Sequence, residues 1–436
     1  MPTGQFIGVH IPIDTFELDN GLRVILSEDH TAPIVAVNLW YHVGSANERE
    51  GRTGFAHLFE HMLFQGSANV QANEHFELIQ RAGGTLNGST WLERTNYYET
   101  VPSHQLALAL WLEADRMGRL LPAMTQDKLD TQRDVVKNER RWSVDNQPYG
   151  TWWERLPELT FPPEHPFHHS LIGSFEDLSA ASLDDVREFF STWYTPDNAV
   201  LTLAGDFDPK QARELIAGYF GWIARGTGHP PLPDMSLPRT FGRRLHSVVH
   251  DAVALPRIYV AMRSPVFATR EYYVASVCGA VLGQGKGSRM HRALVREQRL
   301  ATDATAFTFD LSRGSDLLIV DVLGLPGADA GVLERAVEAE LDRVAGEGVT
   351  EEEVARARAL IETQLLVDLE SVEKRADRLS MFATYCRDPH LLNQELDNYR
   401  QVTAAEVSTF AAEYLGAANR AVLVYLPREA AAELAA

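Results

Sequence analysis

Cysteine is scarce in this chain, with only Cys278 and Cys386 among 436 residues. Two thiols are too few for a disulfide framework of the kind that holds small secreted domains together, or for a zinc site built from four thiolates. We therefore expect both cysteines to be reduced and buried as small apolar side chains.

Basic residues and long apolar runs are also in short supply. Lys and Arg number 40 against 60 Asp and Glu, a net charge of −20, which excludes nucleic-acid binding as the main activity. The best candidate for a membrane span, Leu317 to Leu333, is interrupted by Asp321 and Asp329, so we expect no membrane partner. The first residues lack the charged start and apolar core of a secretory signal, which favours a cytoplasmic location; a mature periplasmic form would look the same.

The composition is that of an ordinary globular protein, 45% hydrophobic and 23% charged, which excludes wholesale disorder. At about 150 residues per domain, the length predicts two or three domains. The segment GHPPLPDMSLPRT, residues 228–240, contains four prolines, and 229–240 is predicted to be a stiff linker. It separates an N-terminal domain, 1–228, from a C-terminal domain, 241–436.

The two halves share an internal repeat. LDDVREFFSTWYTPDNAVLTLAGD and AAEVSTFAAEYLGAANRAVLVYLP both read as an amphipathic helix, a turn and a buried strand, at an offset of 221 residues. The matching pairs are Val186 and Val407, Phe189 and Phe410, and Asn198 and Asn419. This offset, about half the chain, predicts two copies of one α+β domain. In each copy we expect a mainly antiparallel sheet covered by helices.

Hydrophobic periodicity predicts the local elements. Strands are expected as a hairpin at 22–27 and 34–43, as a second pair at 85–91 and 95–101, and as two further strands at 301–311 and 316–323. Helices are expected at 55–64 and 73–82, followed late in the chain by one long charged helix at 351–385.

The helix at 55–64 carries the sharpest chemical signal, His57-Leu-Phe-Glu60-His61. Residues four apart on a helix project side by side, so the two imidazoles can present nitrogens to one metal ion. Glu60 lies next to the pair, where its carboxylate can act on a water instead of binding the metal. The alternative is an amphipathic helix whose histidines form only local hydrogen bonds.

A catalytic zinc site needs a third protein ligand and an open fourth position. Glu139 is the best candidate, because DTQRDVVKNERRW places it on one helix face with Gln132 and Val136. The Val-Val pair indicates that this helix is half-buried and can approach another. The alternative is a surface glutamate among the neighbouring Lys and Arg residues.

These motifs resemble a known family. HLFEHMLFQGS, followed about 78 positions later by VVKNERR, is similar to the inverzincin metallopeptidases, which include pitrilysin, insulin-degrading enzyme, mitochondrial processing peptidase and bacterial relatives. GGTLNGSTWLERTNYYETVP resembles the strand pair that lines the family's substrate cleft, and the resemblance covers about 400 residues.

The resemblance implies a zinc endopeptidase built of two related α+β domains that face another such pair across a chamber. His57, His61 and Glu139 would bind one Zn2+, and Glu60 would be the general base. The substrate would be an unfolded peptide, because an enclosed chamber excludes folded proteins.

Three further positions follow from the same resemblance. Asn87 and Gly88 would lie on a strand edge where a substrate peptide adds as an extra strand, although a simple Asn-Gly turn or bulge is the alternative. Gln132 stands seven residues before Glu139, where many relatives carry Glu. An amide can hold a histidine or a water but cannot act as a base, so we expect Gln132 only to support the ligands.

The C-terminal half departs from active single-chain relatives. Those carry an Arg and a Tyr seven residues apart, placed to bind the substrate and the developing oxyanion; in ALVREQRLATDATAF the positions hold Val295 and Thr302, and Arg296 is one residue off. A homodimer would bring only a second Val295 and Thr302. We therefore expect a hetero-oligomer in which a homologous subunit supplies the Arg/Tyr pair.

The predicted function is zinc-dependent hydrolysis of unfolded peptides, and a processing peptidase for basic targeting sequences is a narrower form of it. The alternative is a non-catalytic structural subunit, as in the respiratory-complex core proteins that share this fold. Such relatives typically have an eroded zinc motif, whereas Glu60 and the three ligand positions are all present here. A scaffold would not need Glu60, and its presence favours the enzyme.

Overall fold

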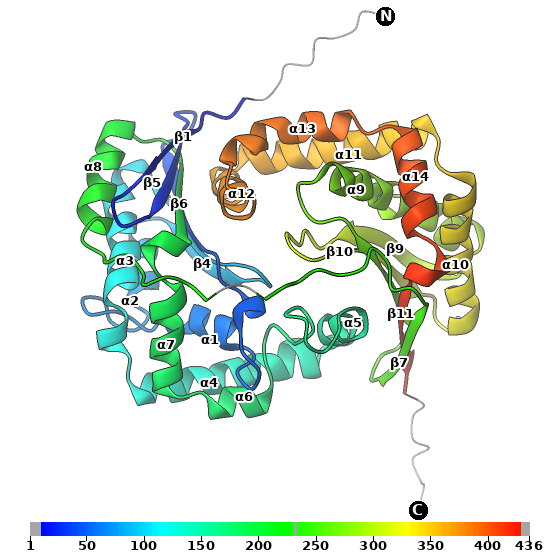
Figure 1. Ribbon diagram of the computed structural model, residues 1–436, viewed down its shortest axis with the longest axis horizontal. Coiled ribbons are helices and arrows are strands. Elements are labelled where there is room, and N and C mark those ends of the chain that lie inside the picture. The colour runs from blue at the N-terminus through cyan, green and yellow to red at the C-terminus, as the bar shows by residue number, and fades with distance from the viewer. Residues whose placement is uncertain (1–9, 231–232, 429–436) are drawn as a thin grey trace, which may run out of the picture. The chain divides into compact units, whose positions relative to one another are not determined.

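A computed structural model describes residues 10–230 and 233–428 (Figure 1). The chain divides into two compact units. The first comprises Met1–Val136, Leu171–Leu232 and Leu366–Leu396, and the second comprises Lys137–Ser170, Pro233–Leu365 and Asp397–Ala436. One cut falls within the predicted linker, 229–240, but two internal segments belong to the unit of the other half. The predicted domains, 1–228 and 241–436, follow the two sequence repeats and do not coincide with the compact units. That division stays a prediction.

The first unit is built on a six-stranded sheet with the order β1-β2-β6-β3-β5-β4. Its strands are β1 Asp14–Glu17, β2 Arg23–Glu28, β3 Ile34–Tyr41, β4 Thr85–Thr90, β5 Thr95–Pro102 and β6 Ala199–Gly205. Neighbours are antiparallel except β2 and β6, which are parallel. The predicted hairpin of β2 and β3 is wrong in its pairing, because β6 lies between them. Every residue of β6 is buried, and such a strand is most stable inside a sheet with both faces covered.

The second unit repeats this plan with five strands in the order β7-β11-β8-β10-β9. Its strands are β7 Leu245–Asp251, β8 Arg257–Ser264, β9 Ala301–Thr308, β10 Asp316–Gly324 and β11 Ala421–Pro427. β11 is parallel to β7 and antiparallel to β8, just as β6 is parallel to β2 and antiparallel to β3. The strands predicted at 85–101 and 301–323 are confirmed, and each pair forms one end of its sheet.

The internal repeat is confirmed by the elements that end each copy. α7, Leu183–Trp193, and α14, Ala404–Tyr414, begin 221 residues apart, and each starts with a capping box, from Ser182 and Thr403 respectively. The side-chain amides of Asn198 and Asn419 then each donate to two backbone carbonyls at matching positions. The expected fold class, two related α+β domains with mainly antiparallel sheets covered by helices, is confirmed.

The remaining helices are α1 Phe55–Met62, α2 Glu74–Arg81, α3 Leu106–Arg119, α4 Gln126–Arg140, α5 Trp152–Thr160, α6 Phe175–Ala180, α8 Pro209–Phe220, α9 Arg270–Gly283, α10 Ala330–Glu347, α11 Glu351–Glu370, α12 Val372–Tyr385 and α13 Leu392–Arg400. The helices predicted at 55–64 and 73–82 are confirmed as α1 and α2. The single helix predicted at 351–385 is wrong, because the chain breaks between α11 and α12. Ser371 accepts the N–H of Lys374 there and starts a new helix.

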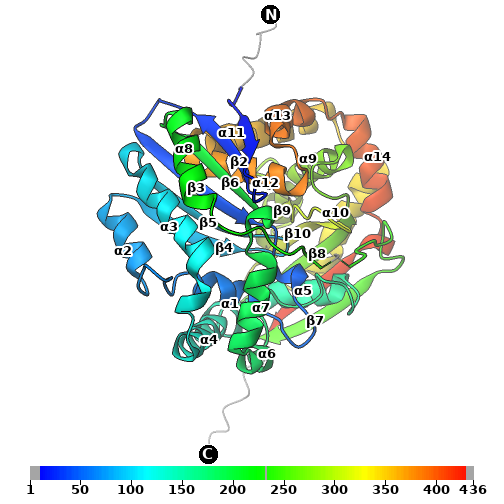
Figure 2. The same cartoon turned by 60° about the vertical axis from the view of Figure 1, so that its left-hand side comes forward.

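In the first unit α3 and α12 cover opposite faces of the sheet (Figures 1 and 2). Side chains alternate along a strand, so neighbouring residues of β3 face different helices. Trp40 donates to Asp377 of α12 at 2.8 Å, and Asn96 of β5 donates to the same carboxylate oxygen at 3.0 Å. The hydroxyls of Thr202 and Ser380 add a buried hydrogen bond of 2.8 Å. α12 therefore packs on this sheet through buried polar groups.

In the second unit α9 packs on β9 and β10, α14 packs on β8, and α5 packs on β7 and β11. The α5 contact is aromatic: Trp152 stacks on Tyr259 with 4.8 Å between ring centroids and 6° between planes. Beside it the hydroxyls of Thr151 and Tyr425 lie 2.7 Å apart. α5 therefore packs on its sheet mainly through rings.

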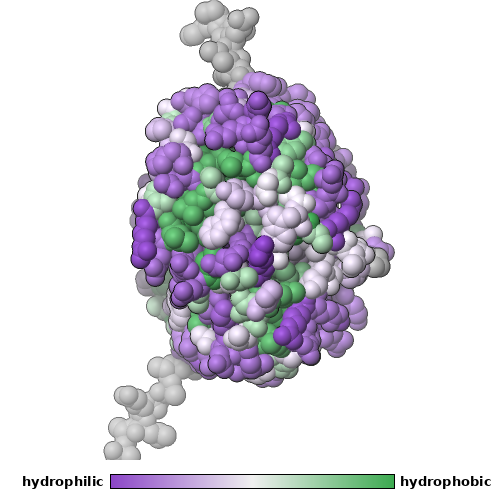
Figure 3. Space-filling view, turned by 90° about the vertical axis from the view of Figure 1, so that its left-hand side faces the viewer, coloured by the Kyte–Doolittle hydropathy of each residue, from purple (hydrophilic) through white to green (hydrophobic). Residues whose placement is uncertain are grey.

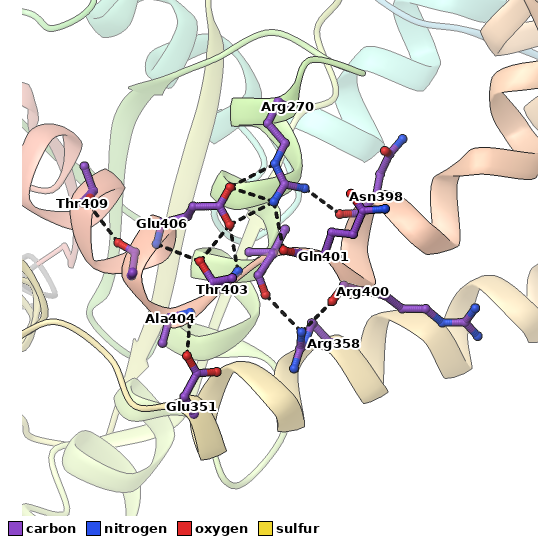
Figure 4. A network of polar contacts seen from close by, with 12 residues as sticks. Arg270, Glu351, Arg358, Asn398, Arg400, Gln401, Thr403, Ala404, Glu406 and Thr409 are labelled. Carbon is purple, nitrogen blue, oxygen red and sulfur yellow. Dashed lines mark hydrogen bonds and ion pairs between the residues drawn. The ribbon is translucent and has the colours of Figure 1, made fainter. Parts of the chain in front are cut away.

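A polar network fixes the N-terminal end of α14 (Figure 4). The guanidinium of Arg270, the first residue of α9, contacts the two carboxylate oxygens of Glu406 at 2.7 and 2.9 Å. It also donates to the carbonyls of Asn398 and Gln401 at 2.9 and 3.0 Å. Arg270 thus joins α9 to the chain segment that leads into α14, at a helix start where backbone carbonyls and a capping carboxylate gather.

The surface shown in Figure 3 is a mosaic in which hydrophilic residues predominate and apolar residues form smaller patches. This pattern is usual for a chain with many charged residues. Within the described ranges, no helix combines the length and the apolar composition needed to cross a bilayer.

The two cysteines are not bonded to each other. Cys278 is buried as expected, and burial raises the pKa of its thiol to about 12. Cys386 is only partly buried, so the expectation of two buried thiols is wrong for this one. Burial still raises the pKa of Cys386, which keeps its thiol protonated at neutral pH.

Candidate metal centre

The start of α1 is set by a glycine and a half-buried glutamate. Gly54 has a φ of +84°, and a Cβ there would lie 2.5 Å from the carbonyl oxygen of Ile172, so only glycine fits. Glu48 accepts the backbone N–H groups of Gly54 (2.9 Å) and Ala56 (2.7 Å), two of the donors that a helix start leaves without helical partners. Burial raises the pKa of Glu48 well above its usual value. These contacts matter because a helix of eight residues is not stable by itself.

The two histidines of α1 lie side by side, as their spacing predicts. Their ring centroids are 4.8 Å apart, with the ring planes at 80°. His57 is buried and His61 is half-buried, whereas Phe55, Leu58 and Met62 on the same helix are at most 2% exposed. One side of α1 therefore belongs to the core and another presents two imidazoles.

Glu139 is carried to the histidines by the last turn of α4. It is half-buried, while Gln132 and Val136 on the same face are buried, so this helix packs as the sequence indicates. The cut between the two compact units falls just after Val136, but α4 continues through it as one helix. Beyond its end the chain forms a π-helical turn over 141–145, an irregularity common at functional sites.

The structure brings the three predicted ligands together. His57, His61 and Glu139 each offer one ligand atom, and these atoms lie within 4.8 Å of one another. Zinc binds imidazole nitrogen and carboxylate oxygen at about 2.0–2.2 Å, so small side-chain movements bring all three to one ion. Two imidazoles and one carboxylate are a donor set that zinc favours, and they leave a fourth position open. The residues present therefore fit a zinc ion, and zinc binding by them stays a prediction.

Glu60 lies beside this group on α1 and contacts the strand β4. Its Oε2 accepts a hydrogen bond of 2.6 Å from the hydroxyl of Thr90, at the end of β4. A Cβ on Gly88 would lie 3.2 Å from the Cγ of Glu60 and 3.1 Å from the ring of Phe64. β4 is thus pressed closely against the helix that carries the candidate base. Sequence reasoning missed Thr90, for which the only signal is its position two residues after the Asn-Gly pair.

The predicted substrate-binding pair lies on the outermost strand of its sheet. β4 ends the strand order, with Gly88 opposite Tyr97 of β5 and Asn87 opposite Tyr98. The side-chain oxygen of Asn87 accepts the N–H of Gly88 at 2.9 Å. The alternative of an Asn-Gly turn is wrong, because both residues are strand residues within β4.

A second polar group, absent from the sequence analysis, lies where α2, β5 and α3 meet. His75 Nε2 is 2.8 Å from Glu99 Oε1, and Glu113 forms an ion pair with Arg116. A nitrogen of His75 and oxygens of both glutamates lie within 4.8 Å of one another, a metal-like arrangement. The buried guanidinium of Arg116 already supplies the positive charge, so we assign an internal ion-pair cluster and not a second metal centre. The only sequence signal is the Glu-Ala-Asp-Arg spacing on α3.

The protonation of this cluster follows from its burial. Burial lowers the pKa of His75 to about 3 and raises that of Glu113 to about 7, and it also raises the pKa of Glu99. Glu99 lies against the imidazole of His75, and Glu113 forms an ion pair with Arg116, so these contacts offset only part of the effect of burial. The cluster therefore holds a neutral imidazole, one guanidinium, and two carboxyls whose protonated forms are favoured by burial.

The two positions expected to lack an oxyanion donor lie in the second unit. Val295 is half-buried in a π-helical segment, His291–Glu297, and Thr302 is exposed on β9, where its hydroxyl donates to the carbonyl of Leu323 at 3.2 Å. Arg296 is exposed on the same segment as Val295. The two positions therefore hold an apolar side chain and a short hydroxyl, and neither is a guanidinium or a phenol.

Known proteins share both the sequence and the fold. Two family models match: insulinase (peptidase family M16) over residues 23–162, and peptidase M16 inactive domain over residues 180–361. The chain is 29% identical to the zinc protease PqqE of Helicobacter pylori over 374 residues, which are 85% of this chain and 83% of that protein. The crystal structure of a protease from Helicobacter pylori has a TM-score of 0.89 at 27% identity, covering 96% of this chain and 100% of that one.

A different kind of relative is cytochrome b-c1 complex subunit 1, mitochondrial, of Bos taurus. It is 27% identical over 268 residues, 61% of this chain and 54% of that protein.

The first family model contains His57, Glu60, His61 and Glu139, and the second spans most of the C-terminal half. With both family models, the fold and a zinc protease in agreement, the chain belongs to the insulinase family of peptidases, peptidase family M16.

Proposed function

We propose that this chain is the zinc-bearing subunit of an endopeptidase that hydrolyses unfolded peptides. The observation that carries the proposal is the convergence of His57, His61 and Glu139, with Glu60 beside them on α1. When bound there, zinc supplies Lewis-acid polarisation of the scissile carbonyl and lowers the pKa of the attacking water.

Glu60 is the general base of this proposal. Its carboxylate takes a proton from the attacking water as the water oxygen bonds to the carbonyl carbon, and then delivers that proton to the leaving nitrogen as the C–N bond breaks. The products are a carboxylate and an amine. Glu60 is half-buried, which suits a group that must meet a solvent water and a substrate in turn.

The substrate binds β4 as an added strand. Among the described strands β4 has a partner, β5, on only one side, and the N–H of Gly88 donates to the side-chain oxygen of Asn87. A peptide that pairs with this edge receives main-chain hydrogen bonds with little reading of its sequence. Extended pairing of this kind requires an unfolded substrate, and an enclosed chamber would impose the same selection.

A homologous partner subunit completes the site. Val295 and Thr302 cannot donate to a developing oxyanion as a guanidinium and a phenol do, and an active site that lacks such donors loses much of its transition-state stabilisation. A partner with the Arg/Tyr pair would supply them. This makes the active enzyme a hetero-oligomer in which this chain contributes the zinc and the base.

The second candidate is a non-catalytic structural subunit. The relationship to cytochrome b-c1 complex subunit 1, and the family model described as an inactive domain, favour it. Against it stands the complete set of His57, Glu60, His61 and Glu139, because a scaffold needs none of these side chains. The two candidates differ in what the loss of Glu60 does.

The test is cleavage of a fluorogenic unstructured peptide by the purified chain, alone and with a homologous subunit that carries the Arg/Tyr pair. Zinc is quantified in the same samples. Glu60→Gln is the inactivating variant, and Glu77→Gln, an exposed glutamate on α2, is its matched control. We expect one zinc per chain, little cleavage by the chain alone, and cleavage with the partner that Glu60→Gln abolishes and Glu77→Gln keeps.

Other results overturn defined parts of the proposal. Robust cleavage by the chain alone, abolished by Glu60→Gln, would retain the peptidase and remove the partner requirement. Cleavage that survives Glu60→Gln would assign the activity to another residue or to a contaminant. Absence of both zinc and cleavage in every combination would favour the structural subunit.

A further inference from the structure

Thr90 joins the outermost strand of the first sheet to the candidate base. Its hydroxyl donates to Oε2 of Glu60 at 2.6 Å, the short distance typical of an O–H donor on a carboxylate. Thr90 is 8% exposed, so water competes little for this bond. It is the last residue of β4 and lies opposite Thr95 of β5.

The alternation of β4 places the two contacts with α1 on one face. Gly88 and Thr90 are two residues apart and both buried, whereas Asn87, between Leu86 and Gly88, is exposed. Gly88 makes room for the Cγ of Glu60, and Thr90 binds the carboxylate at its tip. One strand thus touches the side chain of Glu60 both at its stem and at its end.

We infer that Thr90 is a positioning residue for Glu60: its hydroxyl fixes one carboxylate oxygen and so sets the direction in which the other meets the attacking water. This rests on the proposed peptidase function and deepens it. A base that is misplaced by about 1 Å loses on the order of 10²-fold in rate, so one fixed oxygen has a large effect on kcat. Substrate pairing uses Asn87 and Gly88 of the same strand, so β4 aligns the peptide and the base together.

The experiment compares Thr90→Val, Thr90→Ala and Thr90→Ser in the complex that cleaves peptides. Val keeps the shape and Ala removes the side chain, while Ser restores the hydroxyl without the methyl group. Thr95→Val is the matched control: it removes a fully buried threonine hydroxyl directly opposite, which donates to the carbonyl of Val43 at 2.8 Å. Zinc content, thermal unfolding and crystal structures of zinc-loaded proteins are measured for each.

We expect kcat to fall by about 10- to 100-fold in Thr90→Val and Thr90→Ala, with KM within about 2-fold. The missing hydrogen bond orients Glu60 for the chemical step and takes no part in binding the substrate. Thr90→Ser keeps kcat within about 3-fold. Thr95→Val lowers the unfolding temperature and keeps kcat. In crystals, the Glu60 carboxylate turns away in Thr90→Val, while His57, His61 and Glu139 remain in place.

Three results would overturn the assignment. One is an unchanged kcat in Thr90→Val and Thr90→Ala, and another is a Glu60 carboxylate that stays in place without the hydroxyl. The third is an equal loss in Thr90→Ser, which would transfer the effect to the methyl group. If the wild-type complex cleaves nothing, the proposed function fails, and the crystal structures alone still decide whether Thr90 orients Glu60.

Discussion

The two units carry the same sheet topology but place very different helices after their second long strand. In the first unit that helix is α1, eight residues of which all but two are buried, with two imidazoles and a carboxylate on one side. In the second it is α9, fourteen residues of which all but three are buried. Both helices are mostly buried, but the buried residues of α9 include no imidazole or carboxylate, whereas α1 carries side chains that can bind a metal. The repeated fold therefore does not by itself determine whether a unit has a candidate metal site. The side chains on one helix determine this.

The close approach of helix and strand is solved differently in the two units. In the first, the strand supplies the glycine: a Cβ on Gly88 would meet side chains of Phe64, just beyond α1, of Glu60 in α1 and of Tyr97 in β5 at 3.1–3.2 Å. In the second, the helix supplies it: a Cβ on Gly283 of α9 would lie 2.0 Å from the backbone nitrogen of Ala306 in β9. The second unit therefore brings two backbones together, while the first leaves room for Glu60.

The helices that cover the remaining faces also differ in chemistry. α12 and α5 begin 220 residues apart and are counterparts in the repeat. α12 is held on β3 and β5 through Asp377, and α5 on β8 through the stacking of Trp152 on Tyr259. Buried polar bonds specify one register, because a misplaced carboxylate would be left without donors. Stacked rings tolerate small shifts at lower energetic expense.

The largest expected effect is on the helix that makes the first unit different. His61→Ala removes one of three ligands, so zinc content should fall from one per chain toward zero and peptide cleavage by at least about 10³-fold. His104→Ala, an exposed histidine in the same unit, should change neither. Metal analysis and cleavage of the same samples measure both. Full zinc content in His61→Ala would mean that the histidine pair, which α1 has and α9 lacks, does not bind the metal.

The next effect tests the two glycines. Gly283→Ala should lower the free energy of unfolding by about 3 kcal/mol, because the added Cβ meets backbone that cannot move aside. Gly88→Ala should change it by less than about 1 kcal/mol, because the neighbours are side chains that can shift by a few tenths of an ångström. Urea unfolding of both variants measures the difference. Equal losses would show that the two helix–strand approaches are equally tight.

Much of this organisation was predictable from local sequence, and the failures share one cause. The outer strand pairs, α1, α2 and the repeat at offset 221 followed from periodicity and turn residues, because neighbours in sequence determine them. The hairpin of β2 and β3 failed because β6, distant in sequence, inserts between them. The prediction of one continuous helix over 351–385 missed the break at Ser371, because the apolar pattern continues through it. Long-range insertion and packing leave no mark on a local pattern.

The same reasoning applies at the site. The histidine pair and Glu139 were expected because helix spacing and a family resemblance place them. Thr90 was not expected, because its bond to Glu60 joins a strand and a helix thirty residues apart. The cluster of His75, Glu99 and Glu113 was missed for the same reason, since each side chain comes from a different element. Contacts of this kind become visible only when the elements are packed.

A smaller effect concerns the helices that cover the two sheets. Asp377→Ala should lower the free energy of unfolding by about 2 kcal/mol, because the buried donors of Trp40 and Asn96 lose their acceptor. Asp377→Asn keeps an acceptor oxygen and should lose less. Trp152→Phe in the second unit should lose about 1 kcal/mol, because stacking on Tyr259 is reduced but retained. If Trp152→Phe proves the more damaging, rings and not polar bonds determine how firmly such a helix is held.

The two units also differ in their response to pH, because within the described residues the His75–Glu99–Glu113–Arg116 cluster has no assigned counterpart in the second. The pKa of Glu113 is raised to about 7 in the folded chain, so the native state keeps a proton that the unfolded state releases near pH 4.5. The stability contributed by this proton is fully present below pH 4.5 and is lost as the pH rises toward 7. In Glu113→Gln this loss disappears. The difference in unfolding free energy between wild type and variant should therefore change with a slope of at most about 1.4 kcal/mol per pH unit between pH 4.5 and 7, with the variant gaining relative to wild type.

The lowered pKa of His75 acts in the opposite direction, by destabilising the fold as the pH falls below 6.5, but it is present in both proteins and largely cancels. Urea titrations at pH 5, 6, 7 and 8 measure the slope, and parallel curves for the two proteins would show that Glu113 is ionised throughout.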